Sequence, residues 1–416
     1  MSFLSQQRLS LDHAAFTDLL ADTDNLLVIQ DLDGVCMGLV KDPLTRQMDP
    51  AYLEAVPAFE GHFYVLTNGE HVGQRGINGI VERTMGEAAK GFYLPGLAAG
   101  GVQWQDRYGE LTHPGVSVTE LDFLQSVPEK MTVALRAFLE THRPEMTAEQ
   151  MQDCIQSSVL DNEASPTANL NTCYEVLQDG ALYRQLQQQM VALVDELLAS
   201  AKAQGLDGSF FVHYAPNLGR DESGKEVVWW ADDTTSGTTD FQFMLRGAIK
   251  EAGVLALLNR YYFDKTGRYP LGVSFSARES PRTMADMVAL VKQSFDPALM
   301  PTMVGVGDTV TSQAVIEDGQ KVFKRGGSDR NFLQLIQDIG QALNQPNVIA
   351  YVDSSGGELK NRRPLPIELG VVASGPGDPA DTHDPLTLNV VFPGGHEQYI
   401  GAFRAAAARR KASPAA

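Results

Sequence analysis

Two aspartates with a spacing suited to phosphate chemistry, Asp31 and Asp33, stand in the sequence DLDG directly after the apolar run at residues 25–30. One carboxylate can attack phosphorus and form an acyl phosphate, while the other donates a proton to the leaving oxygen and later activates water. Phosphate and an attacking carboxylate are both anionic, so a hard cation is needed between them, and Mg²⁺ prefers oxygen ligands. The pair therefore predicts magnesium-dependent phosphoryl transfer, with Asp31 as nucleophile and Asp33 as general acid and base.

The metal ligands are expected from two loops that each follow an apolar run. Asp308 comes just after the run at residues 302–306, much as Asp31 follows its own run. Carboxylate and carbonyl oxygens are suitable ligands for magnesium. We therefore expect the side chains of Asp31 and Asp308, with the main-chain carbonyl of Asp33, to bind the ion.

The phosphate group needs hydrogen-bond donors and a cation. Thr67 and Asn68 follow the apolar run at residues 62–66, where a hydroxyl and backbone amides can hold phosphate oxygens. Arg282, in the first turn of an expected helix just upstream of the run that precedes the metal aspartate, is well placed to neutralise the phosphoryl charge. Lys250, in LRGAIKEAG, is the rival candidate.

Apolar runs of strand length, each ending in a polar loop, alternate with stretches of helical periodicity. A helix is expected over residues 281–293, with Ser280 as its cap. This alternation predicts an α/β fold, in which a parallel sheet binds ligands beyond the carboxyl ends of its strands. The expected strands lie at residues 25–30, 62–66, 302–306 and 347–352.

The middle of the chain has a different pattern. It contains long helical stretches at residues 131–140 and 182–203 and a polar, aromatic segment at 213–240. We interpret it as a large α+β cap domain inserted into the parallel-sheet core. The expected boundaries are 1–104 for the first part of the core, 105–272 for the cap, 273–404 for the second part of the core and 405–416 for a disordered tail.

The polar, aromatic segment contains candidates for sugar binding, because aromatic faces pack on the apolar faces of sugar rings. His213 and Trp230 are the residues that we single out. Trp229 is adjacent, and neighbouring residues in a strand point to opposite faces, so only one of the two tryptophans is expected to face a ligand.

The set of motifs resembles the haloacid dehalogenase superfamily. Residues 31–35 (DLDGV) resemble its first motif, Thr67 its second, Arg282 its third, and Gly307 with Asp308 its fourth. The order of the motifs and their positions after apolar runs strengthen the resemblance. It implies a Rossmann-like core, an aspartyl-phosphate intermediate and a magnesium cofactor, and the insertion is similar to the larger cap type of sugar phosphatases in that superfamily.

The resemblance departs from the superfamily pattern at one position. A second acid is usual about four residues after the first acid of the fourth motif, but this chain has Ser312 there. Either Asp308 serves alone, or Asp329 in the GGSDRN turn supplies the second carboxylate. The departure also leaves open a non-catalytic protein that binds a phosphorylated sugar.

Three longer stretches are similar to the salt-tolerance phosphatases that act on glucosylglycerol phosphate. They are DLDGVCMGLVKDP, FYVLTNGEHVGQRGINGIVER and HYAPNLGRDESGKEVVWWADD. This resemblance implies hydrolysis of glucosylglycerol 3-phosphate in compatible-solute synthesis, after a synthase that is a possible partner. A phosphatase for another sugar phosphate, such as sucrose phosphate or trehalose phosphate, is the alternative.

The composition restricts the other partners. The formal net charge of −19 would repel nucleic acids and anionic membrane surfaces. No run approaches the roughly 18 apolar residues of a membrane span, and the N-terminal sequence lacks the features of a signal peptide. We expect a cytoplasmic protein with a small-molecule substrate.

Overall fold

The structure is a computed structural model, and it divides the chain into two compact units. It describes residues 4–40, 43–73, 75–215, 217–220, 225–232, 236–317, 319–359 and 362–412. The core unit consists of Met1–His71, Ile77–Gly115 and Gly247–Ala416. The cap unit consists of Val72–Gly76 and Val116–Arg246.

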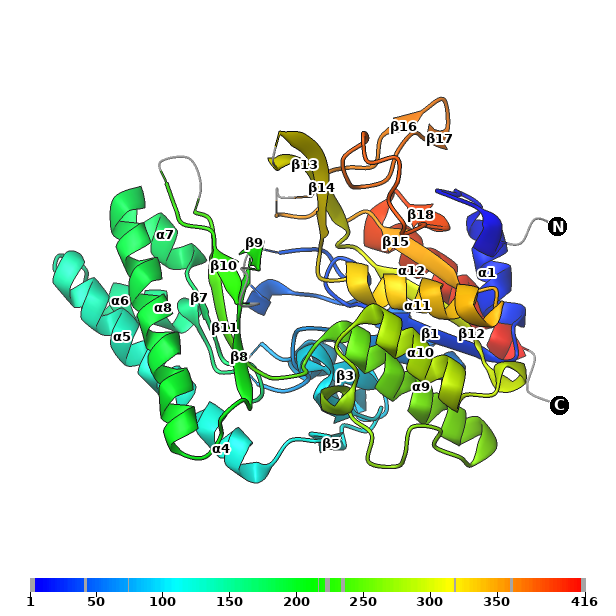
Figure 1. Ribbon diagram of the computed structural model, residues 1–416, viewed down its shortest axis with the longest axis horizontal. Helices are drawn as coiled ribbons and strands as arrows, with labels where there is room; N and C mark the ends of the chain where they lie inside the picture. Colours follow the sequence, from blue (N-terminus) through cyan, green and yellow to red (C-terminus); the bar gives the residue numbers. More distant parts are fainter. Residues whose placement is uncertain are drawn as a thin grey trace. The chain divides into compact units, whose positions relative to one another are not determined.

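An eight-stranded sheet forms the centre of the core unit, with the strand order β18-β15-β12-β1-β2-β3-β4-β5 (Figure 1). Neighbours from β18 to β3 pair in parallel, whereas β4 and β5 are antiparallel to their neighbours. This arrangement confirms the expected α/β class and the four expected strands. The strands are β1 (Leu26–Gln30), β2 (Phe63–Leu66), β3 (Gly96–Ala98), β4 (Gln103–Gln105), β5 (Leu111–Thr112), β12 (Thr302–Gly307), β15 (Val348–Val352) and β18 (Val390–Phe392).

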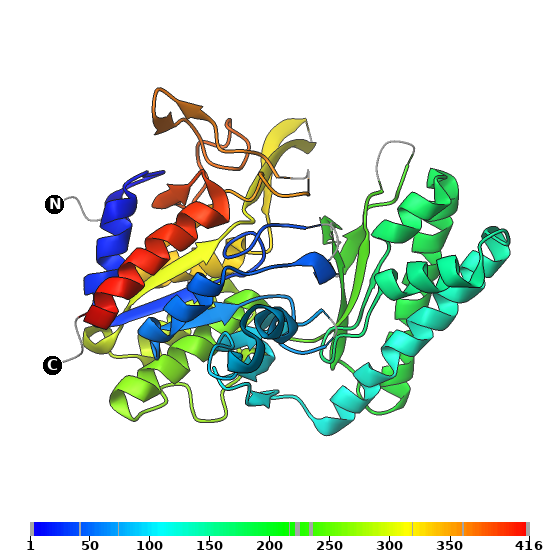
Figure 2. The same cartoon turned by 180° about the vertical axis from the view of Figure 1, so that it is seen from behind.

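Helices cover both faces of this sheet, so its central strands are apolar along their whole length (Figures 1 and 2). Along β1, Leu26 and Val28 pack in one apolar cluster, while Leu27 and Ile29 pack in another on the opposite face. The first cluster includes side chains of α1 (His13–Asp22), α2 (Pro50–Ala55), α3 (Ile77–Met85) and α12 (Gly395–Ala412). The second includes side chains of α9 (Lys250–Thr266), α10 (Met284–Ser294) and α11 (Arg330–Leu343).

The C-terminal segment corrects an expectation. Residues from 405 onward were expected to be disordered, but α12 continues to Ala412. Ala406 and Ala407 are buried in the core cluster, and Arg409 pairs with Asp18 on α1. The alanine-rich composition favours a helix, and burial of these small side chains with the ion pairs to α1 keeps its last turns ordered. The expected tail at 413–416 lies outside the described residues.

The cap unit has the expected α+β composition. Its four-stranded antiparallel sheet has the order β6-β7-β11-β8, and its two long helices match the predicted helical stretches. A further pair of strands, β9 and β10, is antiparallel. The elements are α4 (Val118–Gln125), α5 (Val127–His142), α6 (Ala148–Ser158), β6 (Val159–Leu160), β7 (Thr167–Asn169), α7 (Asn171–Leu177), α8 (Gly180–Ala203), β8 (Phe210–Ala215), β9 (Asn217–Arg220), β10 (Glu226–Val228) and β11 (Asp240–Leu245).

The unit boundaries differ from those expected at 105 and 272. Helix α9 belongs to the core unit, where it packs on β1, β2 and β3. Its side chains Leu255 and Leu258 are fully buried in the second apolar cluster. The cap is therefore shorter than predicted, because the apolar face of α9 covers the parallel sheet.

Candidate active site

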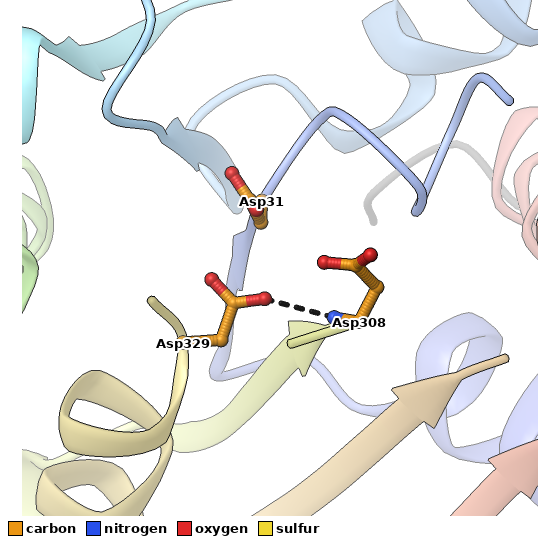
Figure 3. Close-up of side chains that lie close together, drawn as sticks. All are labelled: Asp31, Asp308 and Asp329. Atoms are coloured by element: carbon orange, nitrogen blue, oxygen red, sulfur yellow. Dashed lines mark hydrogen bonds between the residues drawn. The ribbon is translucent and has the colours of Figure 1, made fainter. Parts of the chain in front are cut away.

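Three aspartates converge at the edge of the sheet where β1 and β12 end (Figure 3). Asp31 follows β1, Asp308 follows β12, and Asp329 immediately precedes α11. One carboxylate oxygen from each lies within 4.8 Å of the others. Their exposed fractions are 6%, 1% and 0%. The structure thus brings together two predicted site residues and the acid that the sequence offered only as an alternative.

A hairpin separates Asp308 from Asp329 in the sequence. Strands β13 (Thr311–Glu317) and β14 (Gln320–Gly326) pair antiparallel and return the chain to the end of β12. Asp329 then accepts hydrogen bonds from the backbone N–H groups of Asp308 at 2.8 Å and Thr309 at 3.0 Å. Ser312 lies in β13, and its hydroxyl accepts the N–H of Asp378. Asp329 therefore occupies the acidic position near Asp308, while Ser312 has a structural role.

Lys250 is the cation that contacts Asp31 and Asp329. Its ammonium group lies 2.8 Å from Oδ1 of Asp31 and 2.7 Å from Oδ1 of Asp329, and the residue is 4% exposed. It is the first residue of α9, which begins beside the glycine turn at 99–101. A Cβ atom on Gly100 would lie 2.5 Å from the carbonyl oxygen of Ala248. The glycine thus permits the close backbone approach that places Lys250 against the aspartates.

Arg282, the preferred cation at the sequence level, is placed elsewhere. The residue is exposed and precedes α10, which begins at Met284 with Thr283 as its cap. Ser280, the expected cap, instead ends the short 3₁₀ helix Ala277–Glu279. Among the described residues, the Arg282 side chain has no hydrogen bond or ion pair. The later helix start thus leaves Arg282 outside the cluster that Lys250 occupies.

Burial and the neighbouring charges shift the pKa values of these groups. Burial raises the pKa of Asp31 well above its usual range, and the charge of Asp329 adds to this effect. Burial, together with Asp329, raises the pKa of Asp308 to about 7. Burial also acts to raise the pKa of Asp329, but Lys250 and two backbone N–H groups outweigh it and lower that pKa. Burial acts to lower the pKa of Lys250, but the two aspartates that it contacts raise it. Asp329 and Lys250 thus form a charged pair, whereas ionisation of Asp31 and Asp308 is disfavoured.

The donor set fits a divalent hard cation. All three side chains offer oxygen, which is the ligand type of Mg²⁺. Oδ2 of Asp308 is buried and accepts no hydrogen bond from the described residues. A buried carboxylate oxygen without a donor is costly, and a bound cation would satisfy it. Asp31, Asp308 and Asp329 could therefore hold the ion, while ligation by the main-chain carbonyl of Asp33 stays a prediction.

The glycine of DLDG, Gly34, is required because the backbone there lies very close to the side chain of Asp308. Gly34 has φ +80°, and a Cβ atom there would lie 2.2 Å from Oδ2 of Asp308. Its N–H donates to the carbonyl oxygen of Met37 at 2.9 Å, which closes a tight turn after the first two aspartates. A residue with a side chain at this position would therefore displace Asp308 from the loop that carries Asp31.

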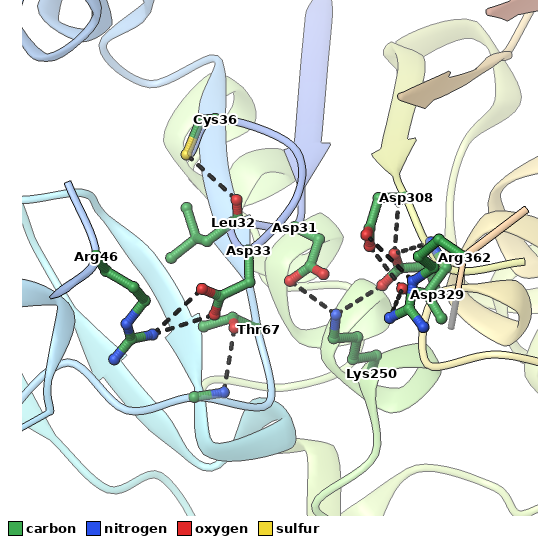
Figure 4. A network of polar contacts seen from close by, with 12 residues as sticks. Asp31, Leu32, Asp33, Cys36, Arg46, Thr67, Lys250, Asp308, Asp329 and Arg362 are labelled. Atoms are coloured by element: carbon green, nitrogen blue, oxygen red, sulfur yellow. Dashed lines mark hydrogen bonds and ion pairs between the residues drawn. The ribbon is translucent and has the colours of Figure 1, made fainter. Parts of the chain in front are cut away.

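Asp33 and Thr67 lie on the other side of Asp31 from Lys250 (Figure 4). Thr67 is 2% exposed, and its hydroxyl accepts the N–H of Gly69 at 3.1 Å. Asn68 is half-buried in the turn after β2. Their roles in phosphate binding stay predictions, but their position at the carboxyl end of β2 is the expected one.

Two arginines of this region were missed at the sequence level. Arg46 contacts Asp33, and Arg362 lies beside Asp308, with Nη2 donating to the Thr309 hydroxyl at 3.1 Å (Figure 4). Neither arginine belongs to a recognisable motif in the sequence. Each arginine lies in a loop that folds back to the site, so no local sequence pattern could have identified it.

The predicted sugar-binding residues both belong to the cap unit. His213 lies on β8, where its Nδ1 atom is 2.9 Å from Oε2 of Glu226. Trp230 follows β10, and the guanidinium of Arg184 lies 5.7 Å from its ring centroid. Trp229 is 38% exposed. A role in sugar binding stays a prediction for His213 and Trp230.

Within the part of the chain that the structure describes, no helix is both long enough and apolar enough to cross a membrane.

Comparison with known proteins identifies the family. Residues 25–407 match the family model for glucosylglycerol-phosphate phosphatase. A glucosylglycerol-phosphate phosphatase of Synechocystis sp. is 60% identical over 417 residues, which cover 98% of this chain and 98% of that protein. The C-terminal domain of trehalose-6-phosphate phosphatase from C. albicans is a distant structural match, with 11% identity and a TM-score of 0.46 over 96% of this chain and 98% of that one. The chain belongs to the glucosylglycerol-phosphate phosphatase family.

Proposed function

We propose that this chain hydrolyses glucosylglycerol 3-phosphate to glucosylglycerol and inorganic phosphate through a phosphoenzyme on Asp31. The observation that carries the proposal is the buried cluster in which Asp31 lies with Asp308, Asp329 and Lys250. Such a surplus of carboxylates at the carboxyl end of a parallel sheet suits phosphoryl transfer assisted by a metal ion. Family membership supports the choice of substrate.

In the first step, an oxygen of Asp31 attacks phosphorus and the bond from phosphorus to the glycerol oxygen breaks. The electron pair of that bond stays on the glycerol oxygen, which takes the proton of Asp33 and leaves as an alcohol. In the second step, Asp33 takes a proton from water, and the water oxygen attacks phosphorus. The bond to Asp31 breaks, phosphate is released, and Asp33 is protonated again.

Lys250 and a bound magnesium ion would counter the negative charge of the phosphoryl group. Lys250 lies 2.8 Å from Asp31, close enough to orient the nucleophile and to compensate charge that develops in the transition state. Magnesium, held by Asp31, Asp308 and Asp329, would supply Lewis-acid stabilisation of the phosphoryl oxygens. Thr67 and Asn68 would donate hydrogen bonds to the same oxygens.

The biological setting is part of the proposal. We place the reaction in the cytoplasm, as the second step of compatible-solute synthesis, after a synthase has joined glucose to glycerol 3-phosphate. Contact with that synthase is a prediction, and co-purification of the two proteins at physiological ionic strength is its test. In the cap unit, His213 and Trp230 are the candidates for sugar binding.

The test is phosphate release from glucosylglycerol phosphate, sucrose phosphate, trehalose phosphate and 4-nitrophenyl phosphate, with and without magnesium. We expect release that requires magnesium and is fastest with glucosylglycerol phosphate. Faster release from another sugar phosphate would keep the mechanism and overturn the substrate. Binding of a sugar phosphate without any release would support a binding protein. The carboxylate of Asp329, close to those of Asp31 and Asp308, weighs against that alternative.

A further inference from the structure

Arg46 holds the side chain of Asp33. Its Nη1 atom lies 3.1 Å from Oδ2 and 3.4 Å from Oδ1 of Asp33. The arginine side chain is 9% exposed, whereas that of Asp33 is 37% exposed. Nε of Arg46 donates to the carbonyl oxygen of Pro43 at 3.0 Å. A buried, anchored guanidinium thus contacts a carboxylate that is partly exposed to solvent.

The backbone around Asp33 is fixed, but its side chain depends on this contact. The N–H of Gly34 bonds to the carbonyl oxygen of Met37, and an isolated bridge joins Met37 to Asp33. These bonds set where the Cα–Cβ bond of Asp33 points, but they do not set its side-chain torsions. A carboxylate exposed to water can occupy several rotamers, and a fixed charged partner favours one of them.

The direction of that rotamer matters for the reaction. Asp33 points toward Arg46, on one side of Asp31, while Lys250 and Asp329 lie on the other side (Figure 4). An acid that protonates the leaving oxygen must lie on the side of the phosphoryl group away from the attacking carboxylate and its cation partners. The contact with Arg46 keeps the Asp33 carboxyl apart from those partners.

We propose that Arg46 is the positioning residue of the general acid, holding the Asp33 carboxyl group toward the leaving oxygen of the substrate. When one oxygen of Asp33 carries the proton, the other oxygen still accepts a hydrogen bond from Nη1. Arg46 then holds the acid and the base form in the same place, so both steps of the reaction use one orientation. This inference rests on the proposed role of Asp33.

The test uses leaving groups that differ in their need for a proton. A sugar alcohol leaves as a strong base and needs the acid, whereas 4-nitrophenolate is a weak base and leaves without one. We compare kcat/KM for the sugar phosphate that is hydrolysed fastest and for 4-nitrophenyl phosphate. The proteins are the native chain, Arg46→Met, Arg46→Lys and Asp33→Asn, and Arg404→Met is the matched control because Arg404 pairs with Asp49 at the surface.

We expect Arg46→Met to lower kcat/KM for the sugar phosphate about tenfold more than for the aryl phosphate. Arg46→Lys should restore part of the difference, because it keeps a cation near Asp33 although it lacks the Nε atom that bonds to Pro43. Circular dichroism and thermal unfolding show whether Arg46→Met folds. If it does not, the comparison is made with Arg46→Lys instead. Arg404→Met should leave both values within twofold of the native chain.

Two outcomes would overturn the inference in different ways. Equal losses for both substrates in Arg46→Met, with a selective loss in Asp33→Asn, would make Arg46 a merely structural residue and leave the function standing. If Asp33→Asn itself lowers both values equally, Asp33 is not the acid, and the proposed mechanism fails together with the role of Arg46.

Discussion

The core unit and the cap unit each contain a buried acidic group, but their local charge balance differs. In the cap, Glu226 accepts hydrogen bonds from the backbone N–H of Tyr214 at 2.9 Å and from Asn217 at 3.1 Å, and it contacts His213. In the core, Lys250 pairs with Asp31 and Asp329, and Arg362 Nε lies 3.8 Å from Oδ2 of Asp308, an oxygen that accepts no hydrogen bond from the described residues.

This difference distinguishes a polar group that stabilises the fold from one that is arranged for chemistry. The donors around Glu226 come from β8 and β9, so the group is compensated within the cap. The core cluster keeps an excess of negative charge, at the cost of raised pKa values for Asp31 and Asp308. Uncompensated buried charge is typical of sites that bind a cation or react.

The largest expected effect is that of Asp31→Asn. The amide is a far weaker nucleophile, so kcat for the sugar phosphate should fall by at least about 10³-fold. The near-identical shape should preserve the fold, which circular dichroism would verify. Near-normal turnover of Asp31→Asn would show that Asp31 is not the nucleophile and that the core cluster does not have the proposed catalytic role.

A smaller but still large effect is expected for Lys250→Met. Loss of the cation between Asp31 and Asp329 should lower kcat about 100-fold or more and reduce the free energy of unfolding by about 3 kcal/mol. Steady-state kinetics and urea unfolding measure the two effects. Arg282→Met is the matched control, and we expect its kcat to stay within twofold, since Arg282 is exposed. The reverse ranking would restore Arg282 as the phosphate-binding cation.

Magnesium should stabilise the core cluster. At 100 times its Kd, a ligand that binds only the folded chain raises the free energy of unfolding by about 2.7 kcal/mol. Thermal unfolding with and without magnesium should show this increase for the native chain and a much smaller one for Asp308→Asn. Asp381→Asn is the control, because Asp381 is buried against Arg325 and lies outside the cluster. Equal stabilisation of Asp308→Asn would mean that the ion binds elsewhere.

The cap should show a modest pH effect that does not depend on the metal ion. Burial raises the pKa of Asp240 to about 6, whereas the pKa of aspartate in the unfolded chain is about 3.9. Between these values the folded chain binds more protons than the unfolded chain. Stability should therefore fall by about 1–2 kcal/mol as the pH rises from about 4 to about 6, and it should then level off. Urea unfolding of Asp240→Asn should show a flatter profile, and an identical slope would contradict the assignment.

The smallest expected effect concerns the adjacent tryptophans. If Trp230 binds the sugar, Trp230→Ala should raise KM for the sugar phosphate about threefold and leave 4-nitrophenyl phosphate unchanged. Trp229→Ala is the matched control, with both substrates unaffected. If Trp230→Ala and Trp229→Ala have the same KM for the sugar phosphate, a specific role of Trp230 in recognition is contradicted.

Much of the fold and the central part of the site were predictable because they depend on local patterns. The apolar runs that precede Asp31, Thr67 and Asp308 became neighbouring parallel strands, and their carboxyl ends carry these residues to one edge. A parallel sheet with helices on both faces buries its strands completely, and continuous apolar runs signal this burial. The boundaries of the cap were less predictable, because the helical pattern of α9 does not reveal which surface it covers.

Local patterns in the sequence predicted the order of strands and loops, the paired carboxylates Asp31 and Asp33, and most of the candidate ligands for magnesium and phosphate. The packing of distant segments brings Lys250 rather than Arg282 to Asp31, returns Asp329 to Asp308 after a hairpin, and pairs Arg46 with Asp33. Asp329 lies 21 residues from Asp308, and Lys250 lies 79 residues from Asp329. The physical reason is that contacts over such separations depend on how helices and hairpins pack, which no local spacing records.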